Sequence, residues 1–116
     1  MQYTSILEDV KKLCQVPEWD DGFDQELIIH INTALMTLTQ LGIGPTGGVY
    51  ITGPEETWAS VVEGDTEIEA VKTYVGLKVK MVFDPPTSSF VLESYKNTIA
   101  ELEWRLNDYA EGAFNE

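Results

Sequence analysis

The chain has very little of what catalytic and metal sites are usually built from. It contains one cysteine, Cys14, and one histidine, His30. A single cysteine excludes a disulfide framework within the chain and any cysteine-rich zinc site, and it favours a reducing, cytosolic environment. His30 lies between Ile29 and Ile31, which indicates a structural histidine at the edge of an apolar stripe. A Cys14–His30 dyad would lack a third group to orient it.

Recognisable reaction motifs are also missing. The sequence shows no zinc spacing, no calcium loop and no nucleophile elbow. The glycines of residues 42–48 follow an expected helix, whereas phosphate-binding glycine loops open a helix after a strand. No carboxylate pair stands out by its spacing or by an apolar setting. We therefore expect no catalytic residue, no cofactor and no metal ion, and we do not expect an enzyme.

Basic residues are scarce. Seven lysines and arginines stand against 20 aspartates and glutamates, which gives a formal net charge of -13. Capture of nucleic-acid phosphates needs a basic patch, and none is visible. The acidity could serve solubility, or it could make a surface that mimics nucleic acid or lets it pass without binding. Composition does not separate these alternatives.

Long hydrophobic runs are absent too. No apolar run reaches membrane-spanning length, and the N-terminal stretch MQYTSILEDVKKL has no apolar core of the signal-peptide type. We expect a protein without membrane association or classical secretion. The 116 residues, 43% of them hydrophobic, fit a single domain over 1–116 with a real core. A chain of this size would also gain from packing against partners.

Two amphipathic helices are expected in the first part of the chain. Apolar residues at helical spacing predict a helix over residues 4–14, ended by Pro17. A second helix should begin with Asp24 as its N-cap and run to about Leu41, where Gly42 stops it. The apolar stripes of these helices are Ile6, Leu7, Val10, Leu13 and Cys14, and Leu27, Ile28, Ile31, Ala34, Leu35, Leu38 and Leu41.

The segment from Glu67 to Phe83 is ambiguous. Apolar residues alternate with glycine and lysine from Val75 onward, a period of two that indicates a strand. The length of the segment favours a helix slightly, because seventeen residues are many for a strand. Such a helix, capped by Asp65 or Thr66, would be apolar around most of its circumference and buried on several sides.

The last helix is expected after the break at Asp84-Pro85-Pro86. Thr87 or Ser88 should cap it, and it should run to about Tyr109, followed by a frayed tail from about residue 110. Its apolar stripe is Val91, Leu92, Tyr95, Ile99, Leu102, Leu106 and Tyr109.

Residues 42–66 should form a long irregular loop, and loops of this length are usually functional or disordered. Residues 49–51 could make a short extended segment, and Thr57 could cap a single turn that holds Trp58. Trp58 is either a local anchor or a contact for a partner, and the two alternatives are about even.

Two helices carry an apolar pair away from their stripes. Ile29 and Met36 lie together on the far side of the second helix, and Phe90 and Trp104 on the far side of the last one. Either the 57–62 region covers one pair, or the pairs belong to a subunit interface, which is the alternative we favour. Glu101 can form an i,i+4 ion pair with Arg105 on that side of the last helix.

Several short motifs, taken together, resemble the head-tail connector (adaptor) proteins of long-tailed bacteriophages. The resemblance covers about residues 5–108 in the same order and with similar spacing. One departure is Gly76, where a bulky residue is expected in this family. The motifs are Ile31-Asn32-Thr33-Ala34, Leu38-Thr39-Gln40-Leu41-Gly42-Ile43-Gly44-Pro45, Trp58, Val71-Lys72-Thr73-Tyr74-Val75, Leu77-Lys78-Val79-Lys80, Phe83-Asp84-Pro85-Pro86 and Glu101-Leu102-Glu103-Trp104-Arg105-Leu106-Asn107.

The resemblance implies an all-α bundle of about four helices and would make residues 67–83 a helix. It also implies a structural virion protein, made in the host cytoplasm, of which about a dozen copies form a ring under the portal vertex. The ring would extend the DNA channel, let DNA pass without specific binding, and dock the next connector or a tail-completion protein.

A ring of identical copies needs two different contact faces on each subunit. We expect the off-stripe pairs and the long loop to supply them, and we hypothesise that the loop orders only on assembly. The alternative is an acidic inhibitor that mimics DNA and acts as a monomer or dimer. The expected subunit or portal contacts are Ile29, Met36, Val49, Tyr50, Ile51, Trp58, Phe90 and Trp104.

Overall fold

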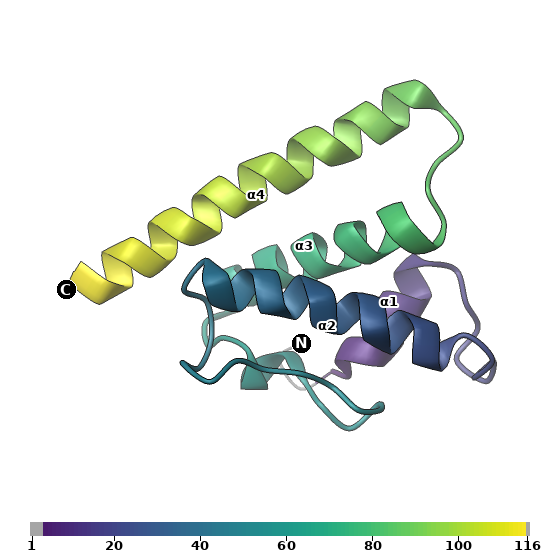
Figure 1. Ribbon diagram of the computed structural model, residues 1–116, viewed down its shortest axis with the longest axis horizontal. Helices are drawn as coiled ribbons and strands as arrows, with labels where there is room; N and C mark the ends of the chain where they lie inside the picture. The colour runs from purple at the N-terminus through teal and green to yellow at the C-terminus, as the bar shows by residue number, and fades with distance from the viewer. Residues whose placement is uncertain (1–3, 116) are drawn as a thin grey trace.

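A computed structural model describes residues 4–115 as a small helical bundle. Figure 1 shows its arrangement, with α2 across one side of the bundle, α4 running obliquely along another, and the long loop and η1 on the side away from α4. The all-α prediction is confirmed, because no strand occurs in the described part of the chain. The elements are α1 (Ile6–Leu13), α2 (Asp24–Gln40), the short 3-10 helix η1 (Trp58–Ser60), α3 (Asp65–Phe83) and α4 (Ser89–Asn115).

The helix α3 is the centre of the bundle. It contacts α1, α2, α4 and η1, so it is enclosed on several sides. This settles the ambiguity of residues 67–83 in favour of a helix, and the unusual apolar circumference follows from this central position. The buried residues of α3 are Ile68, Val71, Tyr74, Val75, Gly76, Leu77 and Val79.

Hydrogen bonds at the C-terminus of α2 explain why it ends where the sequence predicts. The amide of Ile43 donates to the carbonyl of Leu38 at 2.9 Å, and the amide of Gly42 donates to the carbonyl of Thr39 at 3.0 Å. This is the Schellman pattern, which needs a left-handed residue after the cap. Gly42 supplies it with a φ of 92°. The α1 helix closes in the same way, with Gln15 as its left-handed residue at a φ of 62°.

Two predicted N-caps are wrong by one or two positions. Phe23 occupies the N-cap position of α2, and Gly64 that of α3; neither makes a side-chain capping bond. Asp24 instead pairs with the buried ammonium group of Lys11 across a distance of 2.9 Å. The carboxylate of Asp24 therefore forms a tertiary ion pair with Lys11 and does not cap the helix. At α4 the prediction is confirmed, since the Ser88 hydroxyl accepts from the amide of Val91 at 3.4 Å.

The long loop is irregular but packed. The side chain of Asn32 on α2 donates to the carbonyl of Ile51 at 3.0 Å and accepts from the amide of Ile51 at 2.7 Å. Near the other end of the loop, the amide of Ile6 donates to the carbonyl of Glu56 at 3.0 Å. Residues 49–51 form no strand; the pairing in this region is an isolated bridge between Ser5 and Thr57.

The helix α4 is attached mainly through its C-terminal half. Leu106 is buried, and Asn107 donates to the carbonyl of Leu41 at 3.3 Å. The phenol of Tyr74 donates to the carboxylate of Glu103 at 2.7 Å. Toward its N-terminus α4 diverges from α3 (Figure 1). It continues to Asn115, past Tyr109, where the sequence analysis expects the helix to end.

Gly76 lies at the contact between α3 and α1. It is buried, and a β-carbon at this position would meet the Cδ2 atom of Leu13. The missing side chain thus gives Leu13 its place over α3. The departure from the expected bulky residue therefore has a local packing reason, and it leaves the helical geometry of α3 intact.

Candidate assembly surface

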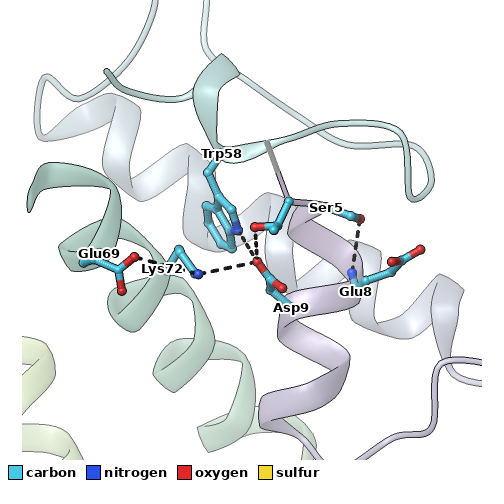
Figure 2. A network of polar contacts seen from close by, with 7 residues as sticks. Ser5, Glu8, Asp9, Trp58, Glu69 and Lys72 are labelled. Carbon is cyan, nitrogen blue, oxygen red and sulfur yellow. Dashed lines mark hydrogen bonds and ion pairs between the residues drawn. The ribbon is translucent and has the colours of Figure 1, made fainter. Parts of the chain in front are cut away.

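A polar network joins η1 to the rest of the bundle, as Figure 2 shows. The indole nitrogen of Trp58 donates to Oδ2 of Asp9 at 2.8 Å, and the same oxygen lies 3.6 Å from Nζ of Lys72. Thr4 donates to this oxygen as well, at 2.6 Å. Lys72 also lies 3.9 Å from a carboxylate oxygen of Glu69. One half-buried carboxylate therefore ties together the start of α1, η1 and α3.

This network is suited to holding structure rather than to chemistry. Trp58 is 0% exposed, so its ring fills the core while its nitrogen is satisfied by Asp9. Within residues 4–115, no cluster of histidine, cysteine, aspartate and glutamate could hold a metal ion.

The candidate base His30 and the candidate nucleophile Cys14 each have their own structural setting. His30 lies 3.6 Å from Glu26 on the same helix. Cys14 is buried at the end of α1, and burial raises the pKa of its thiol. A thiol that is held protonated is a poor nucleophile.

The predicted contact residues divide into two groups. Ile51 and Trp58 belong to the core of a single protomer, which supports the anchor alternative for Trp58. Their burial also argues against the hypothesis that the whole loop orders only on assembly. Val49 is half-buried and packs against the core, whereas the neighbouring Tyr50 is 71% exposed. Among the predicted contact residues of the loop, Tyr50 is therefore the one that remains exposed to a partner.

The off-stripe pairs lie on the surface. Ile29 and Met36 project from α2 with more than half of each side chain exposed. Phe90 and Trp104 project from α4 and are 82% and 70% exposed. The residues of η1 cover neither pair. The protomer thus carries two separate apolar surfaces on two helices, and apolar side chains of this size favour burial against a partner.

Sequence reasoning missed a further exposed aromatic. Trp19, in the loop between α1 and α2, is 83% exposed. In the sequence, the acidic residues and Gly22 dominate this segment and indicate only a turn. Nearby, Phe23 stacks edge-to-face on Phe83 at a centroid distance of 5.3 Å and remains half-exposed.

A cleft of about 380 Å³ separates α3 from the diverging part of α4. Its apolar walls come from Met81, Val82, Ile99 and Ala100. Lys78, Lys96 and Glu103 line it as well.

Comparison with known protein families identifies the family of the chain that carries these surfaces. The family model of the phage connector protein matches residues 6–113, which is nearly the entire chain. The chain belongs to the phage connector protein family. The resemblance found in the sequence is therefore confirmed. No curated protein and no solved structure matches this connector in the corresponding comparisons.

Family membership gives the connector a structural role at the head-tail junction of a virion, where such proteins assemble with portal and tail proteins. The family is a structural one and is not known for enzymes. In the described residues, no helix is both long and apolar enough to cross a membrane.

Proposed function

We propose that copies of this connector form a closed ring of about twelve subunits beneath the portal and so extend the DNA channel toward the tail. The observation that carries the proposal is the pair of exposed apolar surfaces on α2 and α4. A closed ring of identical subunits needs head-to-tail contacts, in which one face of a subunit meets a different face of its neighbour. Ile29 and Met36 supply one face, and Phe90 and Trp104 the other.

The exposed Tyr50 of the long loop is proposed as a further contact, either with a neighbouring copy or with the portal. The buried Ile51 and Trp58 act indirectly, because they anchor the loop in the core on the C-terminal side of Tyr50. The net charge of -13 supports a channel function, since an acidic ring repels the DNA backbone and lets the genome slide without being trapped.

The test is to mix the purified connector with its portal and to measure complex formation by light scattering and negative-stain imaging. The wild type should add a ring to the portal. Replacing Ile29 and Met36 by serine, or Phe90 and Trp104 by serine, should abolish the ring, because each change removes one of two required faces. A matched control is Gln40→Ser, an exposed polar position on α2.

Rings of normal size in both double variants would overturn the proposed faces. A wild-type protein that stays a monomer or dimer and never binds the portal would favour the DNA-mimic alternative.

A further inference from the structure

The cleft between α3 and α4 has an unusual charge for this chain. Three charged side chains line it, the ammonium groups of Lys78 and Lys96 and the carboxylate of Glu103. Glu103 is occupied as a hydrogen-bond acceptor by the phenol of Tyr74. The lining is therefore net positive, while the whole chain carries a net charge of -13.

These two lysines differ from most other cations of the protein. Lys11, Lys72, Lys80 and Arg105 all form ion pairs with carboxylates. Among the described residues, neither cleft lysine has an ion-pair partner. Lys78 lies over the ring of Tyr74, with Nζ 5.8 Å from the centroid. Two lysines beside an apolar wall suit a ligand that is apolar at its centre and acidic at its rim.

The chain itself presents a segment of that chemistry. Trp19 is the most exposed of its large hydrophobic side chains, and Glu18, Asp20 and Asp21 surround it in sequence. The backbone at the start of this segment is held in place by two hydrogen bonds. Lys11 donates to the carbonyl of Glu18 at 3.1 Å, and the amide of Asp20 donates to the carbonyl of Pro17 at 3.0 Å.

We propose that the loop of residues 17–23, here the Trp19 loop, inserts into the α3–α4 cleft of the neighbouring copy in the ring. Trp19 would pack on Met81, Val82 and Ile99, and its flanking carboxylates would face Lys78 and Lys96. This inference rests on the proposed ring, and it names one contact within it. The cleft has room for an indole ring, because its 380 Å³ lies in the size range of ligand-binding clefts.

The contact has the symmetry that a ring requires. Each copy offers one loop and one cleft, so the interaction is head-to-tail and leaves no free site once the ring closes. The aromatic ring supplies buried apolar area, and the charges set orientation and rate of association. A loop that is already ordered in the free protomer loses little conformational entropy when it binds.

Charge reversal tests the pairing. Lys78→Glu with Lys96→Glu, or Asp20→Lys with Asp21→Lys, should each lower ring assembly on the portal by about tenfold or more. Copies that carry all four changes should assemble to within about threefold of the wild type, because the attraction is restored with opposite sign. Trp19→Ala should weaken assembly without any effect on thermal unfolding, since its side chain is exposed.

The matched control restores net charge at the wrong place. Glu63→Lys and Glu111→Lys change two exposed carboxylates outside the cleft and the loop. Combined with the two lysine reversals, they should leave assembly as weak as before. Circular dichroism on every variant shows whether it is folded. As a second measurement, Glu18→Cys with Ala100→Cys, which keeps Trp19, should yield a ladder of covalent oligomers when rings are oxidised.

Each outcome separates this inference from the proposed function. Wild-type rings together with normal assembly of the reversed variants would overturn the loop–cleft contact and leave the ring intact. Loss of assembly without recovery in the fourfold variant would also overturn it, because the carboxylates of the loop and the lysines of the cleft would then not face each other. Absence of any wild-type ring would instead contradict the proposed function itself.

Discussion

The long loop and α4 differ in how much of each is buried, and the irregular loop is the more buried of the two. The loop has little regular structure, yet Ile43, Ile51, Trp58 and Val61 are all buried in the core. By contrast, α4 is the longest helix, and Leu106 is the one buried residue among those whose side chains the structure describes. Regular backbone is therefore a poor guide to what stabilises this protomer. The loop belongs to the core, and much of α4 is surface available for assembly.

The largest expected effect on stability is a difference between substitutions of two tryptophans, Trp58 and Trp104. Trp58→Ala should lower the free energy of unfolding by about 3–5 kcal/mol, because it leaves a cavity and removes the hydrogen bond to Asp9. Trp104→Ala, on the exposed side of α4, should change it by less than about 0.5 kcal/mol. Urea unfolding followed by circular dichroism measures both.

Equal losses of unfolding free energy in the two variants would contradict the difference between a buried loop and an exposed face of α4. If Trp58→Ala does not fold, Trp58→Phe keeps most of the apolar volume and loses the bond to Asp9. It should cost about 1–3 kcal/mol, the usual effect of losing a hydrogen bond to a charged group.

The second prediction concerns the attachment of the loop. Asn32→Ala removes both hydrogen bonds to the backbone of Ile51 and leaves a buried amide and carbonyl unpaired. The expected loss is about 2–3 kcal/mol. Hydrogen exchange of residues 47–56 should accelerate, while exchange in α4 should change little. The control Thr33→Ala, on the exposed face next to Asn32, should leave the loop as protected as in the wild type.

The third prediction concerns the attachment of α4. Tyr74→Phe removes the bond to Glu103 and should cost about 1–2 kcal/mol at neutral pH, with faster exchange in α4 and unchanged exchange in the loop. A loop that loosens as much as α4 would contradict the independence of the two regions.

The same residue predicts a pH dependence. Burial, together with the hydrogen bond to Glu103 and its negative charge, raises the pKa of Tyr74 above its ordinary value of 10.0. The folded state therefore favours the neutral phenol, and this contribution is present below pH about 10 and lost as the pH rises further. Wild-type stability should fall more steeply above pH 10 than that of Tyr74→Phe. Parallel curves of stability against pH for the two proteins would show that ionisation of Tyr74 does not contribute to this pH dependence.

The smallest effect belongs to the exposed side of α4. Glu101 and Arg105 form an i,i+4 ion pair at 2.6 Å, as the sequence predicts. Because both side chains are exposed, Glu101→Gln should cost only a few tenths of a kcal/mol, and less in high salt. Thermal unfolding at low and high salt measures this. A loss above about 1 kcal/mol would mean that this face of α4 contributes more to the fold than its exposure indicates.

The helices could be predicted because helical periodicity is a local signal. The stripe of α2 and the stop at Gly42 follow from spacing and from one glycine, and both are confirmed. The predicted N-cap at Asp24 is wrong because the partner of this carboxylate, Lys11, lies thirteen positions away, and only the folded chain brings the two charges together.

The candidate surface was predictable in part for a related reason. Ile29, Met36, Phe90 and Trp104 lie on regular helices, where spacing alone places them outside the stripe. An irregular loop has no such periodicity, so the burial of Ile51 and Trp58 and the exposure of Trp19 depend on tertiary packing. One available signal was the isolated tryptophan among three carboxylates, a combination that a simple turn does not need.

Because α4 is attached near its C-terminal end, a small rotation there moves its N-terminal end by a larger distance. Leu106 is its buried point, and Phe90 lies 16 residues earlier in the same helix. At about 1.5 Å per residue, that arm is roughly 24 Å long, so a tilt of about 10° displaces Phe90 by roughly 4 Å. Small changes in the angle at Leu106 would thus shift the outer contact by the width of an atom or more. Subunits built this way could adjust to rings of slightly different diameter without repacking their interior.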